Sequence, residues 1–287
     1  MFLAEPGALD ATVAGGTYLL DGAEGRHAGV VQRRGPGERV DVVDGAGVRL
    51  VGRVVHVSAE GVLLDVVEVV REAPPAPALV LAQALAKGDR DEMAIEAATE
   101  LGVDAVVPWQ ADRSIVVWRG DRAAKSRLRW LGTVRAATKQ ARRAWVPDVE
   151  PAVDSAGLVA RAAAVVASGG AALVLHEEAT TPLRDVALPA PGTSAQVLVV
   201  VGPEGGITPA ELERLLAAGA VAVRLGPLVL RTSTAGPVAL ALLSELLHRW
   251  SRPGVRTRGR RGENGWGRSS TTSGHPGGGA RTSRGLV

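Results

Sequence analysis

Two glycine–proline turns lie within residues 198–246, and this stretch constrains the fold more than any other part of the sequence. Residues 197–201 form a short apolar run rich in valine, which is typical of a buried parallel strand. Residues 202–206 follow, and their glycines allow the backbone to approach a ligand closely. A helix start then completes the pattern, with a capping box and a proline at the first helical position, formed by Thr208, Pro209 and Glu211.

The same unit continues into a second strand and a second helix. We expect the first helix to end at Gly219 and the next strand to span residues 221–225. This arrangement predicts that the loops 202–206 and 225–229 lie at the carboxyl ends of neighbouring strands, the edge at which open α/β sheets bind ligands. The second helix opens at residues 231–234, and four of its side chains fall on one face: Val238, Leu242, Leu246 and Trp250.

Composition places the chain among globular proteins. Its 287 residues allow one large domain or two ordinary ones, and 46% of them are apolar. The absence of cysteine excludes disulfides and fits a reducing compartment. No apolar run is long enough to span a bilayer, and the N-terminus lacks the basic region of a signal peptide. We therefore expect a cytoplasmic protein with no membrane partner.

The formal charge of +3 is unevenly distributed. Eight of the 33 basic residues and one of the 30 acidic residues lie in 251–287, which leaves 25 basic and 29 acidic residues before that point, a net −4. The high isoelectric point therefore comes from the tail. Residues 251–287 are rich in glycine, arginine, serine and threonine, and we expect them to be disordered.

Residues 1–72 have the pattern of a small β-rich domain. Three β-branched runs, at 40–43, 50–58 and 62–70, are separated by tight turns, which indicates a little barrel. A short basic segment precedes them, and its side chains either contact RNA phosphates or form a solvated face: Arg26, His27, Arg33 and Arg34.

A stiff proline-rich linker at 73–77 separates this domain from residues 78–250. A strand at 79–84, a helix at 89–101 and a strand at 103–109 follow it, and this alternation predicts a parallel, doubly wound α/β sheet. We expect the helix to turn three side chains inward, namely Met93, Ala97 and Leu101.

A long helix is expected at residues 121–144. One of its sides carries a basic stripe, formed by Arg135, Lys139, Arg142 and Arg143. Trp130 and Trp145 lie close to this stripe in the sequence. Phosphates neutralised by such cations and bases stacked on such rings are typical of RNA binding. The alternative is a solvated face with the tryptophans in the core.

Several common kinds of site are excluded. GPEGG is neither the dinucleotide fingerprint nor a P-loop, and the G-x-S-x-G and H-E-x-x-H patterns are absent. Five scattered histidines and no cysteine leave no metal cluster. A strand at 173–175 ends at His176, on the same edge as the glycine-rich loop. What remains is a crevice of backbone groups suited to a neutral, adenosine-like ligand.

Four segments, in this order and spacing, resemble the RsmE family: HAGVVQRRGPGERVDVVDGAG, AIEAATELGVDAVVPWQADRS, VGPEGGITPAELE and VRLGPLVLRTSTA. These are bacterial 16S ribosomal RNA uridine-N3 methyltransferases of the SPOUT superfamily, and the similarity runs from about Arg26 to Trp250. It implies a PUA-like RNA-binding β-barrel, an α/β domain with a deep trefoil knot, and a homodimer. It also implies S-adenosylmethionine as methyl donor, a uridine in the decoding region of the small ribosomal subunit as target, and no metal.

The resemblance also assigns site residues. It places the cofactor against Leu175, His176, Gly202, Pro203, Gly206, Leu225, Gly226, Val229 and Leu230. Arg231 and Thr232 are expected to be catalytic, with Arg231 either stabilising charge on the uracil or forming a salt bridge at the helix start. Glu204 and His176 are candidate bases, although solvent is an alternative. Each also has a structural alternative: Glu204 as a carboxylate that stabilises its loop, and His176 as a structural residue at the end of its strand.

The chain departs from the family pattern at two positions. Leu228 stands where many members have arginine, and Ser233 stands where many have glutamate, which affects the expected substrate or dimer contacts. Two other functions remain open. One is an inactive module that binds ribosomal RNA, and the other is a SPOUT enzyme that acts on transfer RNA.

Overall fold

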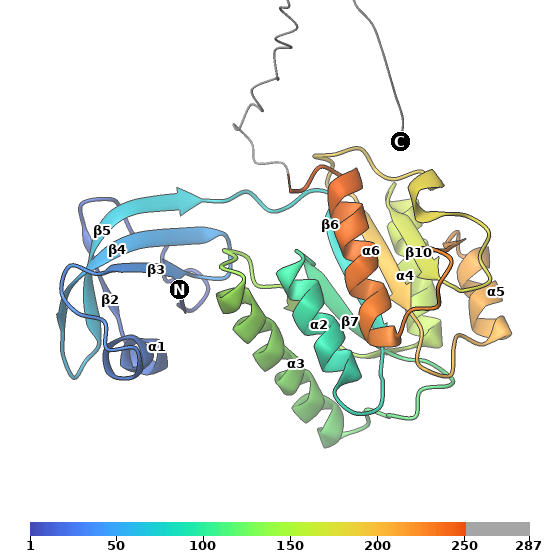
Figure 1. Cartoon of the computed structure of the whole chain (residues 1–287), viewed down its shortest axis with the longest axis horizontal. Helices are drawn as coiled ribbons and strands as arrows, with labels where there is room; N and C mark the ends of the chain where they lie inside the picture. Colours follow the sequence, from blue (N-terminus) through green and yellow to red (C-terminus); the bar gives the residue numbers. More distant parts are fainter. Residues whose placement is uncertain (251–287) are drawn as a thin grey trace, which may run out of the picture. The chain divides into compact units, whose positions relative to one another are not determined.

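The computed structural model describes residues 1–250, which form two β-sheets with their helices (Figure 1). The disorder expected for residues 251–287 lies outside the described part of the chain. None of the helices within residues 1–250 combines the length and the hydropathy that a membrane crossing requires.

The N-terminal sheet has five strands in the order β1-β3-β4-β5-β2. The three strands expected from the sequence are confirmed as β3, β4 and β5, and the sequence analysis missed the other two. The bounds are Phe2–Leu3 (β1), Thr17–Leu20 (β2), Arg39–Val43 (β3), Val48–Val57 (β4) and Val62–Arg71 (β5). Register shifts between β4 and β5 at Val51/Gly52 and Val54/His56 curl the sheet around its own core. Helix α1 (Gly22–Arg26) continues into a π-helical turn at His27–Val31.

The second sheet is parallel, with the order β12-β10-β11-β6-β7-β8, and β9 also pairs with β7. This confirms the expected α/β architecture. Its strands are Ala78–Ala84 (β6), Ala105–Gln110 (β7), Asp148–Val149 (β8), Val153–Asp154 (β9), Ala171–Leu175 (β10), Gln196–Val201 (β11) and Val221–Val223 (β12). The helices are Arg90–Glu100 (α2), Asp121–Gln140 (α3), Ser155–Ala167 (α4), Pro209–Ala217 (α5) and Thr232–Leu246 (α6), with a 3-10 turn at Leu183–Asp185.

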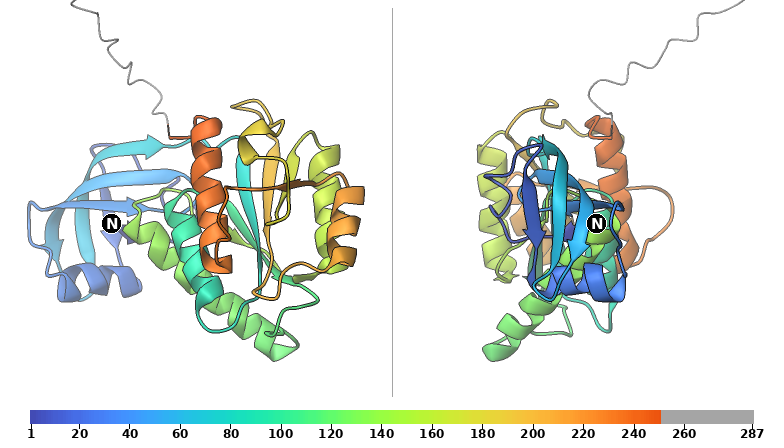
Figure 2. Two further views of the ribbon diagram at one scale, coloured as in Figure 1. Left: turned by 45° about the vertical axis from the view of Figure 1, so that its right-hand side comes forward. Right: turned by 90° about the vertical axis from the view of Figure 1, so that its left-hand side faces the viewer.

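Helices cover both faces of this sheet, as the two views of Figure 2 show. Alternate strand residues feed two separate cores because successive side chains of a strand point to opposite faces. Leu79 and Leu81 pack with α2, α3 and α6, whereas Val80 and Ala82 pack with α4 and α5. The nearly continuous apolar runs in the sequence follow from this burial on both faces.

The prediction for the inward face of α2 was wrong for Met93 and is confirmed for Leu101, which packs against the core. Met93 is 57% exposed, and the helix buries Ala94, Ile95 and Ala98 instead. Helix α6 likewise buries Ala239, Leu240 and Leu243, so the face with Leu242, Leu246 and Trp250 is the more exposed one.

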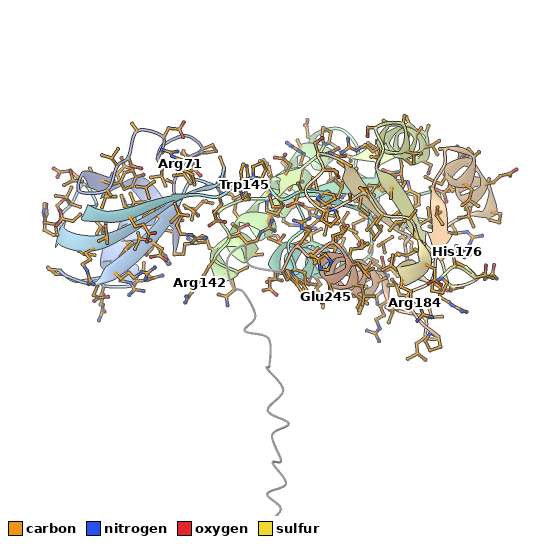
Figure 3. The ribbon with its side chains drawn as sticks, turned by 90° about the horizontal axis from the view of Figure 1, so that it is seen from above. Arg71, Arg142, Trp145, His176, Arg184 and Glu245 are labelled. Carbon is orange, nitrogen blue, oxygen red and sulfur yellow. The ribbon has the colours of Figure 1, made fainter. Side chains whose placement is uncertain are left out.

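Helix α3 ends at Gln140, four residues earlier than expected. Arg142 has a φ of 57°, a left-handed conformation that a continuing helix does not allow. Its carbonyl accepts a hydrogen bond from Arg49 at 2.9 Å, and the Trp145 indole donates to the carbonyl of Glu72 at 3.2 Å. The end of α3 therefore contacts the N-terminal sheet, and Figure 3 labels Arg142 and Trp145 at this contact.

Candidate active site

A cavity of about 850 Å³ opens at the carboxyl edge of the parallel sheet. Its walls are the loops that follow β10, β11 and β12, together with the start of α6. Every residue that the resemblance assigns to the cofactor or to catalysis lines it: Leu175, His176, Gly202, Pro203, Glu204, Gly206, Leu225, Gly226, Val229, Leu230, Arg231 and Thr232. The structure therefore brings these residues together, while their roles stay predictions.

The order of the strands around the cavity differs from the prediction. The loops 202–206 and 225–229 follow β11 and the region of β12, which we expected to be neighbours. Strand β10 lies between them and pairs with both. This position explains why His176, directly after β10 and labelled in Figure 3, lines the same cavity as the two loops.

The loop after β11 depends on its glycines. Gly206 has a φ of 74°, a conformation that side chains disfavour. A Cβ atom at Gly202 would lie 2.7 Å from the side chain of Ile207. Gly205 packs against Arg113, with 3.2 Å between an added Cβ and that of the arginine. The loop therefore keeps its backbone open toward the cavity.

A chain of hydrogen bonds fixes the floor of the cavity. The Thr232 hydroxyl donates to the Gly202 carbonyl at 2.7 Å, and Gln83 Nε2 donates to the Thr232 oxygen at 2.9 Å. Because the single hydroxyl proton goes to Gly202, the threonine oxygen can only accept from the glutamine. Gln83 is fully buried in β6, and its Oε1 has no partner within the described chain. The start of α6 is thereby tied to the ends of β6 and β11.

Sequence reasoning missed Gln83. The only local signal was a polar residue within the apolar run 79–84. Its partner lies 149 residues away in the sequence. Burial of an uncompensated amide is costly, so a glutamine in such a strand indicates a specific contact.

Arg113 lines the cavity, and the sequence analysis missed it too. Its guanidinium donates to the Gly205 carbonyl at 2.9 Å. The loop that carries it is held by Glu211, whose carboxylate accepts from the Asp112 backbone N–H at 2.8 Å and from the Ser155 hydroxyl at 2.5 Å. The glycine-rich loop and the loop after β7 are therefore fixed against each other.

Glu211 is buried and also forms the predicted capping box of α5 with Thr208. Burial alone raises the pKa of this carboxyl group. The hydrogen bonds from Ser155, Asp112 and Thr208 outweigh burial and hold its pKa below the usual value. Glu211 therefore remains an anion at neutral pH and serves two loops at once.

Glu204 forms an ion pair with Arg90, with 2.7 Å between Oε1 and Nη1. Burial by itself raises the pKa of Glu204, but the hydrogen bonds from Arg90 and from backbone N–H groups lower it below the usual value. A carboxylate with a lowered pKa is a weak proton acceptor. This geometry favours a role for Glu204 in holding the loop rather than in proton transfer.

Arg231 precedes the first residue of α6 and is exposed at the cavity. Its backbone carbonyl accepts hydrogen bonds from Thr234 and Ala235 at 2.8 and 2.9 Å. Within residues 1–250 no carboxylate lies within ion-pair distance of its guanidinium, so the salt bridge considered for the helix start does not form there.

The residues predicted to bind RNA come from two segments, and part of each set lies near the N-terminus: the His27 ring lies 5.9 Å from the Phe2 ring, and Lys139 Nζ lies 6.0 Å from the same ring. Near the N-terminal sheet, Gln32 contacts His27 at 3.0 Å, and Arg34 pairs with Glu38 at 3.0 Å. Arg26 and Arg33 are exposed. Two of the four side chains thus have protein partners.

The predicted stripe on α3 is largely paired as well. Lys139 contacts Glu24 at 2.7 Å and Arg135 lies 3.7 Å from Glu5. Arg143 is mostly buried, and it donates to the Thr99 carbonyl at 2.8 Å. Burial lowers the pKa of Arg143 to about 10.

The tryptophans do not form an exposed stacking surface beside the stripe. Trp130 is fully buried and packs edge-to-face on Trp118, with 5.2 Å between the ring centroids. Trp145 donates its indole N–H to the carbonyl of Glu72, directly after β5. The alternative with tryptophan in the core is the correct one for Trp130.

Comparison with known proteins identifies the family. The family model described as "RNA methyltransferase domain" matches residues 73–244. The chain is 47% identical over 237 residues to ribosomal RNA small subunit methyltransferase E of Mycobacterium bovis, covering 82% of this chain and 89% of that one. The chain belongs to the ribosomal RNA small subunit methyltransferase E family. The member from Bacillus subtilis is 34% identical over 79% of this chain and 90% of its own length.

Solved structures of the family share the fold. The methyltransferase E of Neisseria gonorrhoeae, described as bound to S-adenosyl methionine, superposes with a TM-score of 0.73 at 28% identity, covering 85% of this chain and 96% of that one. A Legionella pneumophila structure, described as a putative methyltransferase with bound SAM, gives 0.72 at 28% identity, with 85% and 97% covered. The parallel sheet is thus that of the SPOUT-type RNA methyltransferases.

Proposed function

We propose that this protein transfers a methyl group from S-adenosylmethionine to N3 of one uridine in the decoding region of 16S ribosomal RNA. The observation that carries the proposal is the cavity. Three separate segments line this one cavity at the ligand-binding edge of the sheet. Their residues are the ones that the family resemblance assigns to the methyltransferase site. Family membership supplies the class of reaction.

The residues present fit the cofactor. Glycines at 202, 205 and 206 leave a backbone cradle that Cβ atoms would fill. Leu175, Leu225 and Leu230 provide apolar walls. A cavity of about 850 Å³ that combines this backbone cradle with apolar walls suits a nucleoside held by main-chain groups. When bound, S-adenosylmethionine supplies an activated sulfonium methyl group.

The protein's own contribution is to orient the reactants and to stabilise charge. Orientation in line with N3 accounts for a large part of the barrier reduction, about 7–11 kcal/mol in favourable cases. As uridine N3 loses its proton, negative charge develops on the uracil oxygens. Arg231, exposed at the cavity without a carboxylate partner in residues 1–250, stabilises that charge. Thr232 positions the start of α6 through Gly202 and Gln83.

The proton acceptor is not Glu204, whose carboxylate is already committed to Arg90. His176 remains the candidate side chain. Its Nδ1 accepts a hydrogen bond from the Glu178 backbone N–H at 3.3 Å, so the neutral imidazole carries its proton on Nε2 and takes up a further proton only at Nδ1, once this bond opens.

The finer architecture follows the same family. We propose a PUA-like RNA-binding barrel at residues 1–72, a linker at 73–77, and a methyltransferase domain with a trefoil knot at 78–250. Arg26, Arg33 and Arg142 are exposed cations available to RNA. A homodimer would cover the exposed apolar side chains on the neighbouring helices α2 and α6: Met93, Leu242 and Leu246.

Reverse transcription tests the proposal. Small ribosomal subunits from a strain that lacks the protein are probed before and after incubation with protein and S-adenosylmethionine. Because a methyl group on N3 blocks the Watson–Crick edge, we expect one new stop at a decoding-region uridine. A stop in transfer RNA instead would assign a different substrate. No stop and no binding of S-adenosylmethionine by calorimetry would leave an inactive RNA-binding module.

A further inference from the structure

Helix α3 begins at the same edge of the sheet as the cavity. Strand β7 runs parallel to β6, so its carboxyl end at Gln110 lies on the edge where the loop after β11 opens. The connection 111–120 leaves from this edge, and α3 starts at Asp121. Figure 1 shows the starts of α3 and α6 at the same side of the sheet. Arg113 of the connection lines the cavity itself.

The cations of the later turns of α3 and its end are mostly neutralised within the protein. Four of them have carboxylate partners, in the pairs Arg129–Glu92, Arg135–Glu5, Lys139–Glu24 and Arg143–Asp104. Only Arg142 in this part is exposed without one. The four paired cations therefore serve the packing of α3 on α2 and on the N-terminal domain, and they need no external anion.

The cations at the start of α3 have no such explanation. Arg119, Arg122 and Lys125 are all exposed, and no carboxylate within residues 1–250 lies within 4.0 Å of their charged nitrogens. Arg113 has only a backbone carbonyl as partner. Asp121 is the single acidic residue between positions 113 and 127. Residues 1–250 otherwise carry more acidic than basic side chains, so this concentration is local.

The four cations are close enough to contact one RNA strand. Arg113 and Arg119 are six positions apart in the sequence, which allows at most about 20 Å between their Cα atoms. The helix advances by about 1.5 Å per residue, so Lys125 lies only ~6 Å along the axis from the helix start at Asp121, and Arg122 and Lys125 share one face. A strand whose base enters the cavity therefore passes within reach of this group.

We propose that Arg113, Arg119, Arg122 and Lys125 form a surface that binds the phosphates of the RNA strand whose base enters the methyl-transfer cavity. The inference rests on the proposed function for the identity of the partner. Phosphate contacts of this kind position a strand without reading its sequence. The surface lies at the start of α3, away from the paired cations of the predicted stripe.

Removal of matched charges tests the surface. One variant of the full chain carries Arg119→Ala, Arg122→Ala and Lys125→Ala. The control carries Arg129→Ala, Arg161→Ala and Arg184→Ala, which removes three cations outside residues 1–72 that pair with Glu92, Glu150 and Asp185. Both lose the same charge, and both keep the arginines of residues 251–287.

Fluorescence anisotropy measures binding of a labelled 20-nucleotide oligouridine between about 50 and 200 mM KCl. Each lost phosphate contact on a single strand reduces the slope of log K against log salt by ~0.7. We expect the α3 variant to lose about 2 from this slope and to bind on the order of 10- to 100-fold more weakly at 0.1 M salt. We expect the control to stay near wild type.

Equal losses in the two variants would overturn the inference, because the effect would then be one of net charge. Thermal unfolding establishes that both are folded, and the single variant Arg122→Glu replaces the triple if it is not. Calorimetry with S-adenosylmethionine and methylation of small subunits separate this failure from that of the proposed function. If the wild type methylates subunits but the α3 variant binds RNA normally, only the surface is wrong. If the wild type binds no RNA, both fail.

Discussion

Replacing Thr232 with valine tests the hydrogen-bonded floor of the cavity. The two side chains have nearly the same shape, so the change removes the hydroxyl and little else. The 2.7 Å bond to the Gly202 carbonyl and the 2.9 Å bond from Gln83 are both lost. A buried hydrogen bond contributes about 1 kcal/mol net, and each abandoned partner costs about 1–3 kcal/mol. We therefore expect Thr232→Val to lower the free energy of unfolding by roughly 2–4 kcal/mol.

Gln83→Leu should cost much less, although the residue is fully buried. It removes one hydrogen bond, but it also removes Oε1, which has no partner in the described chain. Thr232 keeps its bond to Gly202. We expect the free energy of unfolding to fall by about 1 kcal/mol or less. The loss of the Nε2 hydrogen bond is partly offset, because the buried and unpaired Oε1 is removed with it.

Urea unfolding measures the free energy of unfolding of each variant. The values are compared when the m values agree, because a shift of the midpoint then reports a change in stability. Thr232→Ser keeps the hydroxyl and provides the conservative variant. Thr99→Val is the matched control, because this buried hydroxyl donates only to Ile95 within α2, at 2.7 Å. If Gln83→Leu destabilises the protein as much as Thr232→Val, the assignment of the hydroxyl proton to Gly202 is wrong.

Three further predictions concern carboxylates. Glu204→Gln should keep kcat within about tenfold between pH 6 and 9, whereas removal of a general base costs ~10²–10⁴-fold, which a pH–rate profile distinguishes. Burial raises the pKa of the Asp91 carboxyl group from the usual 3.8 to about 6. The folded protein therefore binds the carboxyl proton more tightly than the unfolded chain does. As a result, the free energy of unfolding falls as the pH rises from about 3.8 to about 6. Asp91→Asn should therefore raise the free energy of unfolding at pH 7 by about 2 kcal/mol and flatten its dependence on pH in that range; unchanged dependence in urea titrations would contradict this. Glu211→Ala should lower the unfolding free energy by about 2–4 kcal/mol and weaken S-adenosylmethionine binding in calorimetry, because the loop of Arg113 loses its anchor; full affinity would refute the link.

Local patterns were the predictable part of this fold. The capping box of Thr208 and Glu211 spans three residues, so the sequence contains both partners side by side. The same holds for the buried run before Gly202, whose valines fit a strand covered on both faces. The cavity residues followed once these elements were assigned, because parallel strands bring their carboxyl ends to one edge.

Contacts between distant segments were not predictable in this way. Arg113 finds its partner 92 residues later in the sequence, and no local pattern links them. The wrong placement of Met93 has another cause: the alanines of α2 fit either side of the helix, so the local pattern does not decide which side the methionine takes. Met93 is exposed because the small alanines allow α3 and α6 to pack closely against the other side.

The carboxylate of Glu211 has a consequence for motion. Its oxygens accept hydrogen bonds from the first turn of α5, from Ser155 and from the Asp112 amide. Opening of the first turn of α5 therefore releases the loop after β7 at the same moment. Segments that open as one cooperative unit exchange their amide protons with the same free energy. The Asp112 amide should thus exchange together with that of Glu211, and the two walls of the cavity open and close as a single unit.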